Sequence, residues 1–261
     1  MTDLATPRID VRLETRGDGI IAFVTLDHRT KLNILNRALM TEFAAQVKAL
    51  AARKDLRALV LTGAGGKAFI GGADITEMAA LDRDSAPGFI SLVHQTCDGL
   101  RRLPAPVIAR IDGYALGAGL EVAVSCDLRI ASRRSTFGMP EVKVGLPSVV
   151  EAAIIPSLIG FGRARELLML GETIDAETAL RWGLVERVVA AESLDDEVEK
   201  VLNSLLAAGP QAVRRQKALM REWEQLPLDR AIAAGIDAFG RTFETDEPTR
   251  LLGAFMKRKR N

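Results

Sequence analysis

The first third of the chain contains strands with a two-residue period, followed by a helix with an apolar stripe. Residues 9–15 alternate apolar and polar side chains, and residues 20–26 form a second apolar segment after the Gly17-Asp18-Gly19 turn, which predicts a β-hairpin. Residues 36–53 have helical spacing, with Leu39, Phe43, Val47 and Leu50 on one face. Residues 56–61 are mostly apolar and predict a buried strand.

Two glycine-rich junctions between predicted strands and helices follow. The first is KAFIGGADITEM (67–78), in which Asp74 is placed to cap a short helix that starts at Ile75. The second is DGYALGAGLEVAVSCDLRIASRRSTFGMPE (112–141), which has Glu121 in an apolar helical segment and Glu141 directly after Pro140. Backbone N–H groups at a helix start are unpaired and can bind a negative oxygen. A simple strand-to-helix turn remains the alternative interpretation of the first junction.

The remaining pattern predicts an α/β core followed by a helical tail. We expect strands at 107–111, 127–131 and 186–189, and helices at 89–103, 149–159, 163–170 and 176–182. Asp175 and Gly183 are placed to cap the last of these helices at its two ends. From residue 194 onward the pattern is helical without a strand signal. The sequence therefore predicts a core over residues 1–195 and a C-terminal helical region over residues 196–261.

Composition narrows the class of protein. The chain has 261 residues, 48% hydrophobic and 26% charged content, and a formal net charge of +1, which is ordinary for a globular protein and gives no global argument for nucleic acid or membrane binding. Cys97 and Cys126 lack metal-binding or redox spacing, so we expect buried thiols, no metal and a reducing cytoplasmic location. The sequence contains no apolar run long enough for a membrane span.

The candidate chemistry centres on Glu121 and Glu141. A carboxylate in an apolar helix is costly unless it is paired or used, and two carboxylates in one site can divide acid and base roles. The N–H groups near Ala73 and Ala118 could converge on an oxygen that becomes negative during reaction, which is suited to making or protonating an enolate. A satisfied core carboxylate is the alternative interpretation of Glu121. His28 and His94 are expected to be surface or structural residues.

Several motifs resemble the crotonase (enoyl-CoA hydratase/isomerase) superfamily, in the same order along nearly the whole chain. They are KLN (31–33), KAFIGGADITEM (67–78), PAPVIARIDGYALGAGLEVAVSCDLRIAS (104–132), FGMPEVKVGL (137–146) and GETIDAETALRWGLVERVV (171–189). The resemblance implies a crotonase-like α/β fold, a spiral of ββα repeats with a C-terminal helical trimerisation region. It also implies a homotrimer or a hexamer built as a dimer of trimers.

Position by position, the resemblance also implies roles for residues. Ala73 and Ala118 match the two oxyanion-hole donors, and Glu121 and Glu141 match the two catalytic glutamates of hydratases. The residues that match coenzyme A contacts are Lys31, Leu32, Ile75, Phe255 and Arg258, the last two reaching a neighbouring subunit's ligand. The residues expected to shape the acyl pocket are Met139, Leu146, Ser148 and Glu151.

One segment departs from the family pattern. After Gly145, the chain reads LPSVVEAA (146–153), where common hydratases have a glycine-rich loop that lines the acyl pocket and the water site. Ser148 is expected to shift the water, and Glu151 either adds a third carboxylate or is simply an acid in the first turn of a helix. The departure therefore bears on the choice of substrate and reaction.

The activity implied by the resemblance is reversible hydration of a 2-enoyl-CoA to a 3-hydroxyacyl-CoA, a hydro-lyase reaction of fatty acid metabolism. It needs no cofactor, because coenzyme A is part of the substrate. Double-bond isomerisation, or hydration followed by thioester hydrolysis, is the alternative on the same site. A non-catalytic RNA-binding homologue is a further alternative, against which the near-neutral net charge and the short basic end (257–260) argue.

Overall fold

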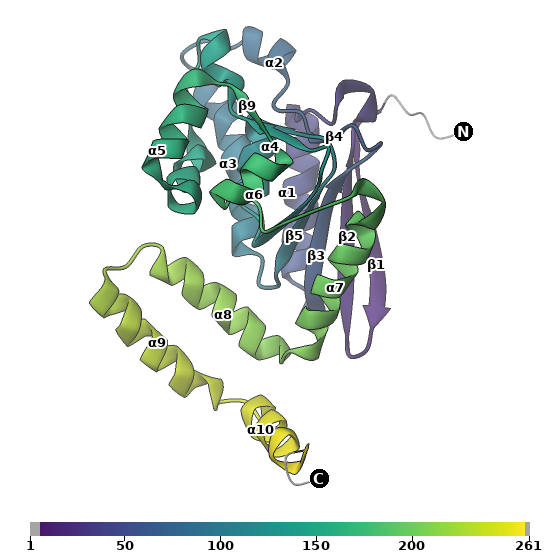
Figure 1. Cartoon of the computed structure of the whole chain (residues 1–261), viewed down its shortest axis with the longest axis vertical. Helices are drawn as coiled ribbons and strands as arrows, with labels where there is room; N and C mark the ends of the chain where they lie inside the picture. The colour runs from purple at the N-terminus through teal and green to yellow at the C-terminus, as the bar shows by residue number, and fades with distance from the viewer. Residues whose placement is uncertain (1–5, 259–261) are drawn as a thin grey trace.

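The computed structural model describes residues 6–258, except the side chain of Arg258, as a mixed α/β fold with a projecting helical tail (Figure 1). In this part of the chain, a six-stranded sheet has the order β1-β2-β3-β5-β7-β10 and a four-stranded sheet has the order β4-β6-β8-β9. The larger sheet comprises β1 (Arg8–Arg16), β2 (Gly19–Asp27), β3 (Leu56–Gly63), β5 (Val107–Ile111), β7 (Leu128–Ser132) and β10 (Arg187–Val189).

The predicted hairpin is confirmed. Strands β1 and β2 pair antiparallel, with Arg16 opposite Gly19 across the turn. From β2 onward, the neighbouring strands of the larger sheet pair in parallel, as expected for strands separated by helical crossovers. Such a sheet is covered on both faces, and alternate side chains of β3 therefore enter two separate apolar clusters.

Helices α1 (Arg37–Ala51) and α3 (Ala86–Arg102) contact each other and contribute to the larger apolar cluster on one face of the sheet. The four apolar residues predicted for one face of α1 are all buried. Its first turn is capped by the Asn36 side chain, which accepts a 2.8 Å hydrogen bond from the N–H of Leu39. Helix α7 (Leu194–Ala207) covers the opposite face, where Leu194, Val198 and Leu202 are buried against the sheet.

The smaller sheet consists of three-residue strands that the sequence pattern did not predict. They are β4 (Ala68–Ile70), β6 (Tyr114–Leu116), β8 (Thr136–Gly138) and β9 (Thr173–Asp175). Strand β6 pairs in parallel with both β4 and β8, whereas β9 runs antiparallel to β8. Helix α4 (Ala118–Val124) packs so closely on β4 that a Cβ on Gly119 would collide with the carbonyl of Ile70.

The helices around the smaller sheet have the predicted N-terminal caps, and one expected α-helix differs in type. Asp74 caps α2 (Ile75–Ala79) and Asp175 caps α6 (Ala176–Trp182), both as predicted. Residues 150–154, expected to be part of an α-helix, form the 3₁₀ helix η3 (Val150–Ile154), and α5 (Ile155–Leu170) follows. The expected glycine break within this region is present, because Gly160 has non-helical φ of 78° and ψ of 154° and α5 consists of two helical segments that meet there at a kink.

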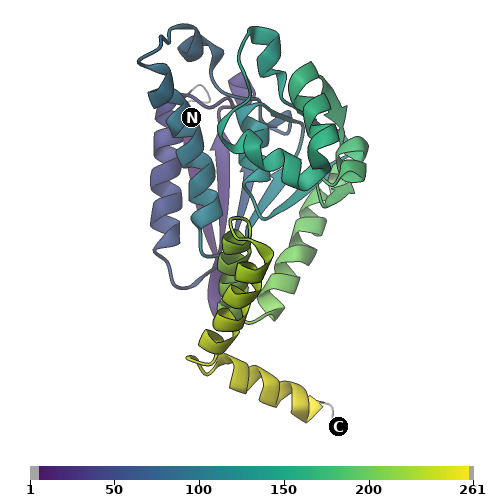
Figure 2. The same cartoon turned by 90° about the vertical axis from the view of Figure 1, so that its left-hand side faces the viewer.

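The tail comprises α8 (Pro210–Trp223), α9 (Leu228–Thr242) and α10 (Glu247–Arg258), and the absence of strands there agrees with the prediction for the described residues. Figures 1 and 2 show α9 and α10 extending beyond the end of the larger sheet. Lys217 attaches α8 to the core, because its Nζ donates to the carbonyls of Leu100 and Ala105 and to Asp127. No helix within residues 6–258 is long and apolar enough to cross a membrane.

Candidate active site

Three short strands bring the predicted site residues to one edge of the smaller sheet. Because β4, β6 and β8 are parallel neighbours, the segments that follow them leave from the same edge. Ala73 follows β4, Ala118 follows β6 and Glu141 follows β8. The carboxyl ends of parallel strands are where ligands bind in open α/β sheets, so this edge is the natural candidate for the site.

The N–H of Ala73 points away from Leu35, the residue with which Ala73 forms a β-bridge. Ala73 forms an isolated parallel bridge with Leu35. The bonds of that bridge are made by the Gly72 carbonyl and the Asp74 N–H, each at 2.8 Å from Leu35. In an extended segment successive N–H groups point to opposite sides, so the Ala73 N–H points away from Leu35.

Ala118 is the first residue of α4, where a helix leaves the backbone N–H without an intrahelical acceptor. Gly117 precedes it with φ of 52° and ψ of −125°, a conformation that glycine adopts without steric cost. Ala118 itself lies inside the regular helix, and its φ is not positive. An alanine at this position is therefore compatible with the helical backbone.

Glu121 lies one turn into α4 and is only 3% exposed. Its Oε1 accepts a 3.3 Å hydrogen bond from the N–H of Ala152 in η3. Burial, the largest cause, acts together with the negative charges of Glu141 and Glu151 and against the Ala152 N–H, and the net effect raises the pKa of Glu121 to about 8. Glu121 therefore carries a proton at neutral pH in the free protein.

Glu141 lies in the 3₁₀ helix η2 (Pro140–Val144) and is half-buried. Its Oε2 accepts a 2.8 Å hydrogen bond from the hydroxyl of Ser148. Its Oε1 lies 2.5 Å from the position that a Cβ on Gly117 would occupy. The two glutamates are therefore near each other, since Gly117 directly precedes the helix of Glu121 and the charge of Glu141 reaches Glu121.

A third glutamate, Glu151, is 4% exposed and forms a 2.8 Å hydrogen bond between its Oε1 and Nδ1 of His94. His94 on α3 and Glu151 on η3 are separated by 57 positions, so the sequence pattern did not indicate that they are partners. Among the other residues predicted for the acyl pocket, Met139 is fully buried and Leu146 is 40% exposed. The buried thiols of Cys97 and Cys126 are both free. In residues 6–258, no group of three side chains that could hold a metal ion is found.

Three of the residues predicted to contact coenzyme A lie at the surface of the core. Lys31, Leu32 and Ile75 are exposed, and Leu32 has a left-handed φ of 55°. Buried Asn33 fixes this loop, because its side chain donates to the carbonyls of Ala64 and Ala68 and accepts from the N–H of His28. A cavity of about 220 Å³ adjoins the loop, lined by Arg29, Leu32, Asn33, Ala64, Gly65, Lys67 and Ala68.

The tail residues of this prediction lie elsewhere in the chain. Phe255 is 55% exposed on α10, at the opposite end of the molecule from α2 (Figure 1). Arg258 ends α10, and its side chain lies outside the described residues. Within one chain, these two positions are therefore separated from Lys31, Leu32 and Ile75.

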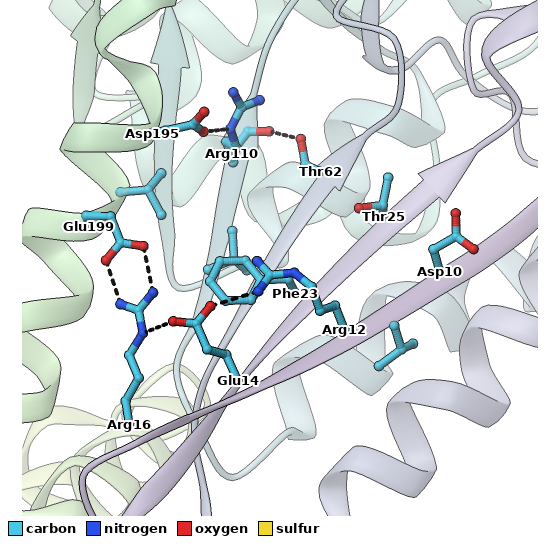
Figure 3. Close-up of a pocket in the computed structure, with 13 residues that line it drawn as sticks. Asp10, Arg12, Glu14, Arg16, Phe23, Thr25, Thr62, Arg110, Asp195 and Glu199 are labelled. Carbon is cyan, nitrogen blue, oxygen red and sulfur yellow. Dashed lines mark hydrogen bonds and ion pairs between the residues drawn. The ribbon is translucent and has the colours of Figure 1, made fainter.

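A larger groove of about 620 Å³ lies on the other face of the six-stranded sheet, between β1, β2 and α7. Figure 3 shows two ion pairs that join the sheet to α7, Arg16 with Glu199 and Arg110 with Asp195. Arg16 bonds both Glu14 and Glu199, and Arg12 lies 4.1 Å above the ring of Phe23. The groove faces the α7 side of the sheet, whereas α4 belongs to the larger cluster on the opposite side, so it is separate from the three glutamates.

Comparison with known proteins matches residues 16–261 to the family described as enoyl-CoA hydratase/isomerase. A crotonyl-CoA hydratase of Syntrophomonas wolfei is 37% identical, covering 92% of this chain and 94% of the relative. A short-chain-enoyl-CoA hydratase of Clostridium acetobutylicum is 34% identical, covering 93% and 94%. The crystal structure of an enoyl-CoA hydratase from Bacillus anthracis superimposes with a TM-score of 0.89 at 30% identity, covering 95% of this chain and 96% of that one. These similarities confirm the expected crotonase-like α/β fold.

Proposed function

We propose that this chain, which belongs to the enoyl-CoA hydratase/isomerase family, reversibly hydrates a 2-enoyl-CoA thioester to a 3-hydroxyacyl-CoA. The observation that carries the proposal is the position of Glu121 and Glu141 beside the segments that contain Ala73 and Ala118. The names of the two curated relatives support hydration rather than isomerisation, since both are hydratases. The reaction would be a step of acyl-CoA, and hence fatty acid, metabolism.

The backbone donors would stabilise the charge that develops during the reaction. In this scheme, the thioester oxygen accepts hydrogen bonds from the N–H groups of Ala73 and Ala118. The oxygen gains negative charge as the reaction becomes enolate-like, so donors that are already oriented lower the barrier. Loss of one such donor typically costs about 3–4 kcal/mol in activation free energy.

The two glutamates would move the protons. In hydration, Glu121 takes a proton from the water that adds to C3, and Glu141 delivers a proton to C2. In dehydration, the protonated Glu121 donates to the leaving hydroxyl, while Glu141 removes the C2 proton. Each direction needs one proton on the pair: hydration starts with that proton on Glu141, and dehydration starts with it on Glu121, the residue that holds a proton at neutral pH in the free protein. Positioned acid–base groups of this kind contribute about 10²–10⁴-fold in rate.

Coenzyme A would bind along the exposed loop at Lys31 and Leu32, with Ile75 nearby. The adjoining cavity has two cationic residues, Arg29 and Lys67, in its lining, which suits the phosphates of the cofactor portion of the substrate. No separate cofactor enters this scheme, because the coenzyme is carried by the substrate. Cytoplasmic localisation and the domain boundary at residue 195 stay predictions.

The tail would assemble subunits into a homotrimer, or into a hexamer of two trimers. Helix α9 and the residue that caps its C-terminus carry an exposed apolar stripe at helical spacing, formed by Leu228, Ile232, Ile236, Phe239 and Phe243. A stripe of this size is typical of a surface that another chain covers. Because Phe255 is remote from the loop at Lys31 in its own chain, we assign it and Arg258 to the coenzyme A site of a neighbouring subunit.

A direct assay separates this proposal from its alternatives. Crotonyl-CoA is mixed with the purified protein, loss of the conjugated thioester absorbance is followed, and the product is identified by mass spectrometry. Hydration adds one water, isomerisation of a suitable enoyl-CoA leaves the mass unchanged, and thioester hydrolysis releases free coenzyme A. Full activity in both Glu121→Gln and Glu141→Gln would refute the assignment. Tight, salt-sensitive RNA binding without turnover would favour the non-catalytic alternative.

A further inference from the structure

Glu151 belongs to a segment that touches both glutamates of the proposed active site. The hydroxyl of Ser148 donates to Glu141, and the N–H of Ala152 donates to Glu121. Glu151 lies between these two donors in the chain, on η3, and its residue surface is 4% exposed. A substrate held between Glu121 and Glu141 therefore has residues 148–152 along one side.

The two oxygens of the Glu151 carboxylate differ in their surroundings. Oε1 is hydrogen-bonded to Nδ1 of His94 at 2.8 Å. Oε2 is shielded from solvent and, among the described residues, has no hydrogen-bond partner. A buried acceptor without a donor destabilises a protein by about 1–3 kcal/mol, and more when it is charged. A hydrogen-bond donor on a ligand would satisfy this oxygen.

The carboxylate of Glu151 also lies within electrostatic reach of the reacting groups. Its charge is one of the causes that raise the pKa of Glu121. It contributes as well to the raised pKa of the buried Cys97 thiol on α3. Glu151 is an acid in the first turn of η3, as the simpler interpretation expected, but it is buried in the interior between α3 and α4.

We propose that Oε2 of Glu151 accepts a hydrogen bond from a hydroxyl group on the acyl chain, so that the enzyme selects hydroxylated 2-enoyl-CoA thioesters over unsubstituted ones. This inference rests on the proposed function. A neutral hydroxyl matches the single open acceptor, whereas an ammonium group would bring three donors and leave two of them unpaired in a buried site. His94 is a positioning residue, because it fixes the carboxylate without touching the substrate.

The test compares matched substrates with the full-length protein. Initial rates are measured for an unsubstituted trans-2-enoyl-CoA and for thioesters of the same chain length with a hydroxyl at C4, C5 or C6. For at least one hydroxylated thioester, we expect kcat/KM to exceed that of the unsubstituted one by about tenfold or more, the size of one hydrogen bond to a charged group. Equal values across the series would overturn the inference.

Substitutions test whether the preference for hydroxylated thioesters depends on Glu151. Glu151→Leu should bring the ratio of the two kcat/KM values to about one, because the acceptor is removed. Glu166→Leu is the matched control, since Glu166 is exposed on α5, and it should leave the ratio unchanged. His94→Asn should lower the ratio partially, and His94 is 52% exposed, so this change leaves the core packing intact. An equal loss for both thioesters in Glu151→Gln would instead make Glu151 a catalytic residue and overturn the inference.

A failure of the proposed function is distinguishable from a failure of this inference. If no thioester is hydrated, the proposed function is wrong, and the inference is then decided by calorimetric binding of the same thioesters. Tighter binding of a hydroxylated thioester that disappears in Glu151→Leu would support it. Equal affinity for the two thioesters in the unmodified protein would overturn it.

Discussion

The hydroxyl of Ser148 donates a 2.8 Å hydrogen bond to Oε2 of Glu141, seven residues earlier in the chain. The donor of this bond lies in the segment 146–153, where the sequence departs from the glycine-rich loop that the resemblance to the family led us to expect. It fixes one oxygen of a half-buried carboxylate and leaves the other directed toward Gly117. The departure therefore orients one of the two proposed catalytic groups.

Removal of that hydroxyl should lower turnover. In Ser148→Ala, we expect kcat for crotonyl-CoA to fall about tenfold, because the carboxylate of Glu141 loses the bond that orients it. Ser157→Ala is the control, since Ser157 is exposed and bonds only the carbonyl of Ile154. Equal kcat values in the two variants would show that Glu141 does not depend on Ser148.

Gly117→Ala should damage both stability and activity. The new Cβ would lie 2.5 Å from Oε1 of Glu141, and φ of 52° is unfavourable for an L-residue. We expect a loss of about 1–2 kcal/mol in the free energy of unfolding from the backbone alone, measured by urea denaturation. Displacement of the carboxylate should lower kcat about 10–100-fold. Gly162→Ala is the control, because nothing lies within 4 Å of its Cβ position.

The pH dependence of catalysis should be the same in both directions. Hydration neither consumes nor releases a proton, and each direction needs one proton on the Glu121–Glu141 pair. Because the pKa of Glu121 is raised to about 8, the free enzyme loses that proton as the pH rises through this value. We therefore expect kcat/KM for both hydration and dehydration to decline above about pH 8. A kcat/KM for hydration that increases through pH 8 would contradict the one-proton scheme.

The same carboxyl should make stability depend on pH. The pKa of Glu121 is about 8 when folded against an ordinary 4.5, so the folded state binds more protons between these values. The free energy of unfolding therefore decreases as pH rises through this interval, by a total on the order of 4 kcal/mol from this group. Glu121→Gln removes the titration and should become more stable than the unmodified protein as the pH approaches about 8.

Urea denaturation at several pH values and at one fixed protein concentration measures this difference, because assembly would otherwise contribute. Glu166→Gln changes an exposed glutamate and serves as the control. A stability difference between Glu121→Gln and the unmodified protein that stays constant from about pH 5 to about pH 8 would contradict the raised pKa.

Local signals in the sequence were sufficient for the larger elements. The hairpin of β1 and β2, the apolar face of α1 and the caps at Asp74 and Asp175 all follow from neighbouring residues, and each is confirmed. Strands β4, β6, β8 and β9 were missed because three residues are too few to show a two-residue period. Their pairing is determined by contacts between distant segments rather than by local propensity.

In the candidate site, too, local sequence indicated some features and not others. The glycines and the two glutamates indicated the candidate chemistry from the sequence alone. The specific roles of Ala73, Ala118, Glu121 and Glu141 came from the resemblance and stay predictions. The bond between His94 and Glu151 joins residues 57 positions apart, so no local pattern indicated it. The pKa of Glu121 also depends on burial and on Glu141, both of which arise only when the chain folds.

The close approach of α4 to β4 has a consequence for the engineering of this protein. Gly119 faces the Ile70 carbonyl, so this contact is between backbones and accepts no larger side chain. Combinatorial libraries that randomise this region would mostly return unfolded variants. Residues 146–150 instead have exposed or half-buried side chains, and libraries directed there should yield folded catalysts with altered substrate ranges.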